Sequence, residues 1–413
     1  MELLLITIYM GLNLLDFKKY RFYNTINVTI GAYVVITVLN NVLATHFGFY
    51  KVGVKVQFVI LVAMVLIYMS ALIRRQIKAH GKVLVCRTIQ SNDGIEEIFQ
   101  NKRKVRIIAA YFILCCLARA IQICCTIKVY GMDYLGQCDF EQLNLSGIPS
   151  HLFLSVYPVA GFIFYYAIKK KSFWSFVLYL SGLGISFLSF IKYNAIFYVI
   201  FTFVFCVILD SKLGKRLVIL LGTTIVAIFI GNYILGFALR NITKFGMANY
   251  LSRLWDYVGG SMINGNHCIH FFESEVGYSA VDILISSFFP LISIVSAKLF
   301  HHTIVSPVFP MGIQMLSDIG NTSNVAGLLF NVSYTGSMLL FIGFCLMEGW
   351  IVEGILKKVR MKQYQSNLFF YSMVLTIAIM TFFANYFTLS TIWELLVWSY
   401  LIPKVLIFSR FCI

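Results

Sequence analysis

Long apolar segments recur along the whole chain, separated by short polar or basic segments. A membrane-spanning helix needs about 20 mainly apolar residues, and somewhat fewer where long side chains at its ends reach the interface. Eleven such segments are present, at roughly 1–15, 26–45, 56–73, 107–128, 151–168, 174–191, 195–209, 217–237, 325–347, 367–385 and 387–402. The pattern predicts an all-α integral membrane protein with about 11 transmembrane helices, forming a single polytopic membrane domain over 1–413.

Composition narrows the class of protein. Apolar residues make up 60% of the 413 residues and charged residues only 12%, whereas about a quarter of a soluble domain is charged. These values exclude a soluble enzyme, a secreted disulfide scaffold and a disordered regulator. Residues 1–15 lack a basic leader and a small-residue cleavage site, so we expect a retained first helix and not a signal peptide.

The net charge of +16 would suggest a polyanionic partner in a soluble protein. Here the positions of the basic residues explain it without a nucleic acid, because short cytoplasmic loops retain Lys and Arg. Sorted by successive apolar segments, 24 Lys and Arg fall on one side and 8 on the other, with Arg119 inside the fourth segment. We therefore expect the N-terminus outside, the C-terminus inside, a basic cytoplasmic loop at 74–106 and one large outer loop at 238–324.

The large outer loop is the longest segment outside the predicted helices, so functional residues are expected there. It combines cations, aromatic rings and candidate acid–base groups: Arg240, Lys244, Tyr250, Arg253, Trp255, His267, His270 and Glu273. Its apolar stretch at 281–300 contains Pro290, and this stretch fits a short buried helix, a re-entrant segment or one leg of a further hairpin. The loop is thus predicted to contain short or re-entrant helices.

A cationic and aromatic surface at the membrane boundary complements an anionic lipid-linked saccharide. Arginine binds phosphate through two parallel hydrogen bonds, and aromatic rings pack against sugar C–H groups. Lys192 lies in a predicted outer turn between two apolar helices, where the alternative is a lysine that merely reaches the interface. Arg119 is an intramembrane cation and hence a functional candidate; the alternative is a tie to a carbonyl group or to Asp16.

The outer loop lacks the paired carboxylates that hold a divalent ion in many sugar-transfer sites. His267, His270 and Glu273 form the only close set of candidates for a general base, and histidine titrates near neutral pH. Their spacing would also place them on one face of a helix as zinc ligands, but Gly265 and the absence of an HExxH motif disfavour zinc. A disulfide between Cys138 and Cys268 is a further alternative, since both lie outside the predicted helices.

Four segments carry a family resemblance: SGIPSHLFLSVYPVAGF, FLSFIKYNAIFYVI, ALRNITKFGMANYLSRLWDYVGGSMINGN and SNVAGLLFNVSYTGSM. With these segments, many spans and one dominant outer loop, the chain resembles the bacterial O-antigen and oligosaccharide repeat-unit polymerases, the Wzy-type family. The resemblance assigns roles to Arg240, Lys192 and, more loosely, Arg253. Many relatives have an acidic residue just before a glycine where this chain reads Phe-Asn-Val-Ser-Tyr-Thr-Gly at 330–336.

The resemblance implies polymerisation of undecaprenyl-pyrophosphate-linked oligosaccharide repeats, of O-antigen or capsular type, on the periplasmic face of the bacterial inner membrane. We expect a metal-independent glycosyltransferase without a cofactor, surrounded by membrane lipids, with a flippase and a chain-length regulator as implied partners. The expected catalytic residues are Arg240, His267, His270 and Glu273. The expected substrate-binding residues are Lys192, Lys244, Arg253, Tyr250, Trp255 and Arg119. An O-antigen ligase and a flippase for lipid-linked oligosaccharides are the alternatives.

Overall fold

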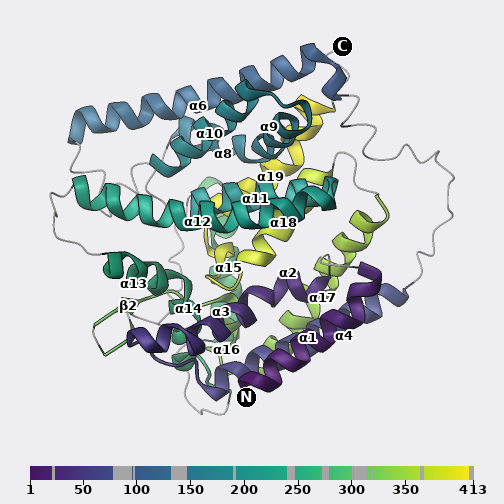
Figure 1. Ribbon diagram of the computed structural model, residues 1–413, viewed down its shortest axis with the longest axis vertical. Coiled ribbons are helices and arrows are strands. Elements are labelled where there is room, and N and C mark those ends of the chain that lie inside the picture. Colours follow the sequence, from purple (N-terminus) through teal and green to yellow (C-terminus); the bar gives the residue numbers. More distant parts are fainter. Residues whose placement is uncertain are drawn as a thin grey trace. The chain divides into compact units, whose positions relative to one another are not determined.

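The chain folds into two compact units, each built from separate stretches of sequence (Figure 1). The first unit contains Met1–Lys82, Leu251–Arg360 and Ile377–Trp393, and the second contains Val83–Tyr250, Met361–Thr376 and Glu394–Ile413. This computed structural model describes residues 1–20, 24–77, 95, 98–131, 147–188, 192–239, 247–271, 279–299, 301, 314–318, 320–362 and 367–408. At some positions within the helices it describes the backbone alone.

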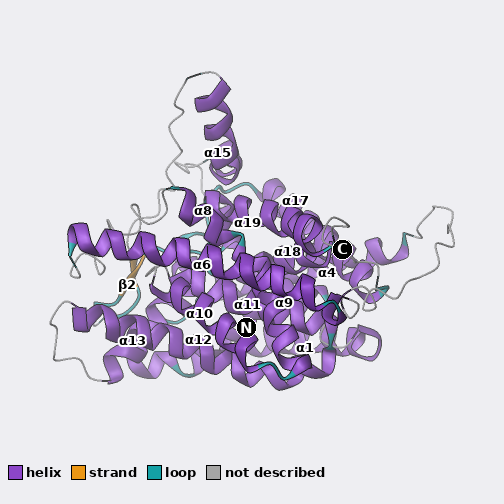
Figure 2. Cartoon of the chain, turned by 90° about the horizontal axis from the view of Figure 1, so that it is seen from above, coloured by secondary structure: helices purple, strands orange, loops and turns teal. Residues whose placement is uncertain are grey.

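Nearly all of the described chain is helical, as the sequence predicts (Figure 2). The first unit has α1 (Glu2–Tyr20), α2 (Thr25–Thr29), α3 (Gly31–Val42), η1 (Ala44–Phe47), α4 (Val54–Gln76), α14 (Gly260–Asn264), η3 (Gly265–His267), α15 (Ala280–Leu299), α16 (Leu328–Ser333), α17 (Met338–Arg360) and η5 (Tyr386–Thr388). The second has α6 (Lys102–Tyr130), α8 (Ile148–Leu154), α9 (Val156–Lys170), α10 (Phe173–Leu188), α11 (Lys192–Leu209), α12 (Ser211–Leu239) and η6 (Pro403–Ile407). Helices α13 (Met247–Val258), α18 (Leu368–Met380) and α19 (Ser390–Ile402) contain residues of both units.

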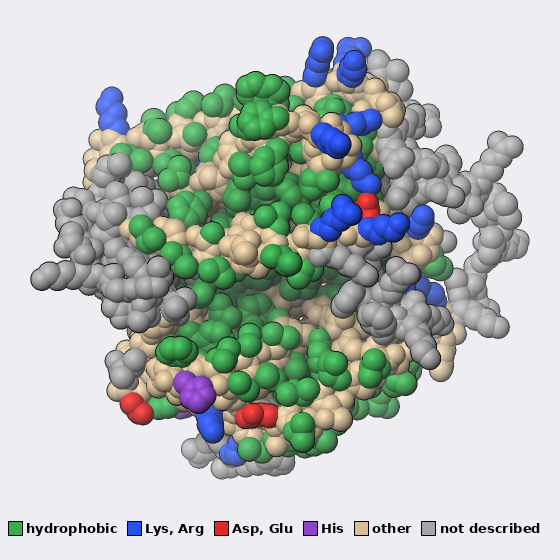
Figure 3. All heavy atoms as spheres, in the orientation of Figure 1, with side chains coloured by type: hydrophobic (Ala, Val, Ile, Leu, Met, Phe, Trp, Pro, Cys, Tyr) green, Lys and Arg blue, Asp and Glu red, His purple; other side chains and the backbone are tan. Residues whose placement is uncertain are grey.

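Among the described residues, four helical segments are long and apolar enough to cross a membrane: Val54–Gln76, Lys102–Tyr130, Met338–Arg360 and Ser390–Ile407. The bent pair α8–α9, with an angle of 41° between its helices, makes a fifth if it is counted as one span. Large apolar side chains are exposed on several helices, and Figure 3 shows hydrophobic groups over much of the visible surface. A soluble monomer rarely exposes contiguous apolar surface on this scale, whereas a bilayer would cover it.

The ninth predicted segment differs from the helix that forms. The sequence places it at 325–347, but α16 ends at Ser333 and α17 begins only at Met338. Gly336 between them has φ +67°, a left-handed conformation that interrupts a helix and suits glycine. As a result, α17 extends to Arg360 and includes Glu348 and Glu353, two carboxylates that the predicted segment leaves out.

Helices α4 and α17 of the first unit pack closely through a glycine. A Cβ atom at Gly349 would lie 2.5 Å from the backbone oxygen of Ile67, so only glycine allows this approach. Nearby, Tyr33 packs edge-on against Phe330 with ring centroids 5.8 Å apart, and its hydroxyl donates to the Thr381 carbonyl oxygen at 2.7 Å. These contacts join α3, α4, α16 and α17 around one apolar core.

Part of the predicted outer loop packs against the short segment that precedes α4. Strands β1 (Gln314–Met315) and β2 (Thr322–Ser323) form an antiparallel pair, and Phe49 makes an isolated bridge to Ser317. The Tyr50 hydroxyl donates to Asp318 at 2.9 Å. This hydrogen bond to a carboxylate raises the pKa of Tyr50 above its ordinary value. The hairpin is therefore held in place by contacts from a distant part of the chain.

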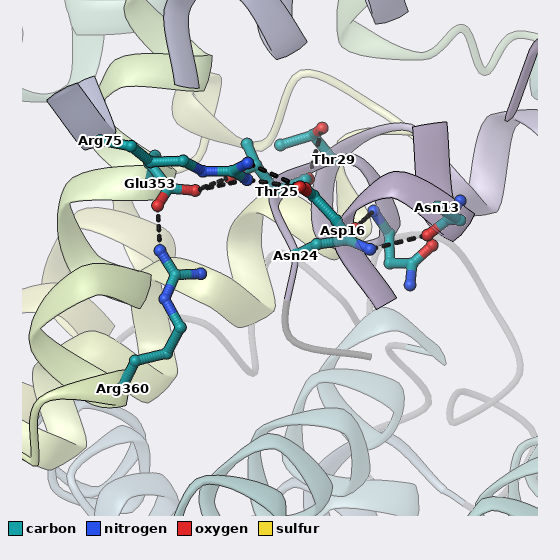
Figure 4. A network of polar contacts seen from close by, with 9 residues as sticks. Asn13, Asp16, Asn24, Thr25, Thr29, Arg75, Glu353 and Arg360 are labelled. Carbon is teal, nitrogen blue, oxygen red and sulfur yellow. Dashed lines mark hydrogen bonds and ion pairs between the residues drawn. The ribbon is translucent and has the colours of Figure 1, made fainter. Parts of the chain in front are cut away.

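A buried network of charges joins four helices of the first unit (Figure 4). Arg75 on α4 donates to both carboxylate oxygens of Asp16 on α1, at 2.7 and 2.8 Å, and to Glu353 on α17 at 3.1 Å. Glu353 also pairs with Arg360 and accepts a hydrogen bond from the Thr25 hydroxyl of α2 at 2.7 Å. Each described carboxylate of this network pairs with an arginine. We therefore interpret the network as structural: it stabilises the packing of these four helices.

In the second unit, local caps set the ends of the helices. The Asn101 side chain accepts a hydrogen bond from the Lys104 N–H at the start of α6, and Gly131 ends this helix with φ +83°. Gly147, with φ +92°, precedes α8, and Pro149 occupies its first turn. These residues begin α8 at the place where the candidate site lies.

The two predicted loops are partly helical. Helix α4 extends through Arg74 and Arg75 and α6 begins at Lys102, so helices occupy both ends of the 74–106 loop. Within 238–324, α13, α14 and α15 are helical, and α15 covers the apolar stretch around Pro290 as one helix. The expectation of helices inside the large loop agrees with these elements.

Candidate functional site

The predicted site residues fall into three groups. Arg240, Lys244 and Glu273 lie outside the described residues. The structure describes the backbone of Lys192 in α11 and of Tyr250 and Arg253 in α13, while their side chains lie outside the description. The described side chains are those of Arg119, Trp255, His267 and His270.

Arg119 on α6 is buried, with 3% of its surface exposed. Its Nη1 donates to Gln122 Oε1 on the same helix and to Ser150 Oγ on α8, both at 2.6 Å. The guanidinium thus ties α6 to α8 through two neutral groups. The proposed tie to Asp16 is wrong, because Asp16 accepts the hydrogen bonds of Arg75 instead.

Tyr157 brings the start of α11 to the same end of the second unit. Its hydroxyl donates to the Asn194 carbonyl oxygen at 3.2 Å and contacts Ser186 Oγ at 3.1 Å. Since α11 begins at Lys192, two residues before Asn194, this hydrogen bond holds the start of α11 against α9.

His151, the residue after Ser150, forms a pair with Glu394. His151 Nδ1 is 2.7 Å from Glu394 Oε2, and the Trp398 indole N–H donates to Glu394 Oε1 at 2.8 Å. The His151 side chain is 54% exposed, whereas that of Glu394 is 21% exposed. Ser150 thus contacts the buried Arg119 of α6, and the next residue, His151, contacts the Glu394 carboxylate of α19. We define Arg119, Gln122, Ser150, His151 and Glu394 as the α8 cluster.

Trp255, the predicted aromatic site residue of the first unit whose side chain is described, joins two helices. Trp255 on α13 donates its indole N–H to Asn40 Oδ1 on α3 at 2.7 Å. Close by, the Asn264 side-chain amide donates to the carbonyl oxygens of Ser323 and Val325, at 3.2 and 2.8 Å. Asparagine side chains therefore hold α13, α14 and the hairpin against α3, and the Trp255 ring anchors this arrangement.

The histidines of the large loop do not share a helical face. His267 ends the short helix η3, and the backbone after it is irregular through His270. His267 is exposed, while His270 is half-buried, with its ring edge-on to Tyr334 at a centroid distance of 4.8 Å and its Nε2 3.0 Å from the His267 carbonyl oxygen. Among the described residues, no group of three His, Cys, Asp or Glu side chains is placed to hold a metal ion.

Cys268 between these histidines is buried against the core of the first unit, and burial raises the pKa of its thiol to about 12. Its proposed partner, Cys138, lies outside the described residues. The disulfide stays a prediction.

Sequence reasoning did not single out the His151–Glu394 pair. His151 falls in the quoted segment SGIPSHLFLSVYPVAGF, and its neighbouring Gly147 and Pro149 mark a helix start, which was the available signal. Glu394 gave no comparable signal, because it stands alone in an apolar segment 243 residues further along the chain.

Comparison with protein-family models, with curated proteins and with solved structures finds no match for this chain.

Proposed function

We propose that the chain is a polytopic inner-membrane glycosyltransferase that polymerises lipid-linked oligosaccharide repeats on the outer face. The observation that carries the proposal is the α8 cluster, in which Ser150 contacts the buried Arg119 and the next residue, His151, pairs with Glu394. A cation suits a lipid pyrophosphate, and a histidine suits a sugar hydroxyl. The resemblance to the Wzy-type polymerases points to the same chemistry.

The proposal includes eleven spans with the N-terminus outside. Each of the eleven predicted ranges contains at least part of a described helix. Contacts between helices agree with the predicted sides: Asp16, Arg75 and Glu353 all belong to expected cytoplasmic ends and contact one another. Ser150 and His151 belong to an expected outer end, whereas Arg119, which contacts Ser150, lies inside the fourth predicted segment.

The proposed reaction needs positive charge more than it needs a metal ion. When a glycan leaves undecaprenyl pyrophosphate, negative charge accumulates on the departing phosphate. Fixed cations aimed at that charge supply electrostatic stabilisation, which is usually the largest single contribution to catalysis. Arg119 and Lys192 are proposed to anchor one lipid pyrophosphate, and Arg240 with Lys244 of the outer loop the other.

Elongation by the purified protein tests the function. In detergent, synthetic lipid-linked repeats should become longer oligomers, because detergent abolishes sidedness and therefore transport. EDTA should leave elongation intact, and an absolute requirement for added magnesium would contradict the metal-free mechanism. Failure of the intact wild-type protein to elongate any tested repeat would contradict the polymerase assignment.

Matched cation variants test the site. Lys192→Ala should lower elongation, whereas Lys128→Ala, which removes an exposed cation near the end of α6, should not. Arg240→Ala should abolish elongation and Arg240→Lys should restore it only in part, because lysine cannot form two parallel hydrogen bonds. Wild-type elongation by both Lys192→Ala and Arg240→Ala would refute the proposed anchors.

The glycan pattern of a deletion strain separates a polymerase from the two alternatives, a ligase and a flippase. Loss of a polymerase leaves core with a single repeat, while loss of a ligase or a flippase leaves bare core.

A further inference from the structure

The His151–Glu394 pair has the geometry of an oriented imidazole. The Glu394 carboxylate uses Oε1 to accept from the Trp398 indole N–H, a group that can only donate, and uses Oε2 for His151 Nδ1. A carboxylate oxygen can only accept, so the 2.7 Å contact requires the proton of the neutral ring to be on Nδ1. Nε2 then carries the lone pair, on a side chain that is 54% exposed.

The His151–Glu394 pair lies beside the residue that contacts the buried cation. Ser150, the residue before His151, accepts a hydrogen bond from buried Arg119, so α8 presents a cation contact and a basic nitrogen on adjacent residues. The break after Leu154 separates α8 from α9 and sets the direction of α8 independently of the longer helix. On the proposed function, a lipid phosphate drawn to this end of α8 would bring its attached sugar toward His151.

We propose that His151 is the general base of the transfer, and that Glu394 is a positioning residue that fixes its tautomer. This inference rests on the proposed function. His151 Nε2 takes the proton of the acceptor hydroxyl while its oxygen forms a bond to the anomeric carbon of the donor glycan. The bond from that carbon to the pyrophosphate oxygen breaks, and its electron pair leaves with the lipid pyrophosphate. The imidazolium afterwards returns its proton to solvent.

A contact that only joined α8 to α19 would behave differently. Exposed ion pairs contribute about 0–1 kcal/mol to stability, so their loss would leave the fold and the activity largely intact. A general base contributes roughly 10²–10⁴-fold to rate. The two roles therefore predict different results for the same substitutions.

The experiment measures elongation of lipid-linked repeats by the purified full-length protein, with kcat and KM determined separately. His151→Ala should lower kcat at least 100-fold with little change in KM, and added imidazole should restore kcat at least tenfold, because it can occupy the vacated space. Glu394→Gln should lower kcat without imidazole rescue, since its amide N–H can donate to Nδ1 and shift the ring proton to Nε2. His46→Ala, which removes an exposed histidine of the first unit, is the control and should match wild type.

His151→Gln addresses misfolding, because glutamine can still hydrogen-bond Glu394 yet cannot act as a base. It should retain the wild-type melting temperature and be as inactive as His151→Ala. Elongation within threefold of wild type by either His151 variant would overturn the inference, and so would a folded, inactive His151→Ala that imidazole does not rescue. An inactive wild-type protein would instead overturn the proposed function, which distinguishes the two failures.

Discussion

Arg75 should be among the least replaceable charges in the first unit. It neutralises Asp16, whose side chain is 5% exposed, and shares in neutralising Glu353, whose side chain is fully buried. Replacement by methionine keeps much of the aliphatic stem but removes the guanidinium. Glu353 retains Arg360 and Thr25, so the substitution acts mainly on Asp16.

The expected loss of stability comes from Asp16, because Arg75→Met removes its buried ion pair. Removing one partner of a buried ion pair costs about 3–5 kcal/mol, because the remaining charge is neither solvated nor paired. Arg75→Met should therefore lower the free energy of unfolding by about that amount. Adding Asp16→Leu removes the stranded carboxylate, so the double variant should be more stable than Arg75→Met alone.

Arg74→Met is the matched control, since it changes the adjacent arginine of the same helix. The Arg74 guanidinium carbon lies 4.6 Å from the centroid of the Trp350 ring, and a half-buried contact of this kind contributes roughly 0.5–2 kcal/mol. Unfolding would be followed by titration with SDS in mixed micelles, with labelling of the buried Cys345 thiol as the readout. Equal midpoints for Arg75→Met and Arg74→Met would refute the reasoning, as would a double variant less stable than Arg75→Met.

Three further predictions concern packing, topology and thiol reactivity. Gly349→Ala should destabilise the α4–α17 contact by about 1–3 kcal/mol, whereas Gly343→Ala on the same helix, where a Cβ meets nothing within 4 Å, should be neutral or stabilising. The same SDS titration compares the two variants, and equal effects would argue against the close approach of the helices. A cytoplasmic reporter should be active after Lys171, Arg216 or Lys362, and a periplasmic reporter after Lys55, Gly260 or Asn321, so cytoplasmic activity at Gly260 would overturn the predicted sides. In the folded protein at pH 8, Cys345 should resist alkylation because its side chain is buried, and mass spectrometry should find it modified only after unfolding; rapid labelling would contradict its burial.

Much of the helical content could be read from the sequence, because segment length and hydropathy respond to the same free energy of transfer out of water. Helices occur in every predicted range. The main error arose where hydropathy continued through a backbone break: residues 325–333 are apolar enough to extend a span, yet Gly336 separates them from α17. Hydropathy averages over such a break and does not detect it.

The candidate site was less accessible to the sequence. Arg119 stood out because a lone charge in an apolar segment is rare. Its partners Gln122 and Ser150 did not, since neutral polar residues are common near helix ends. Glu394 becomes a candidate only because it contacts His151. The two residues are 243 positions apart, so no local sequence pattern predicts their contact.

The sequence by itself determined the helical character of the chain, the approximate positions of its helices and the expected distribution of basic residues between two sides. These properties depend on each segment alone, through its length, apolar content and charge. The tertiary structure decided that Asp16 pairs with Arg75, that Arg119 ties α6 to α8 and that Glu394 orients His151. Such pairs depend on how each helix is rotated and which neighbour it packs against, because a hydrogen bond requires its atoms to lie within about 3 Å of each other. Hydropathy carries no information about that rotation, so these contacts emerge only when the helices pack.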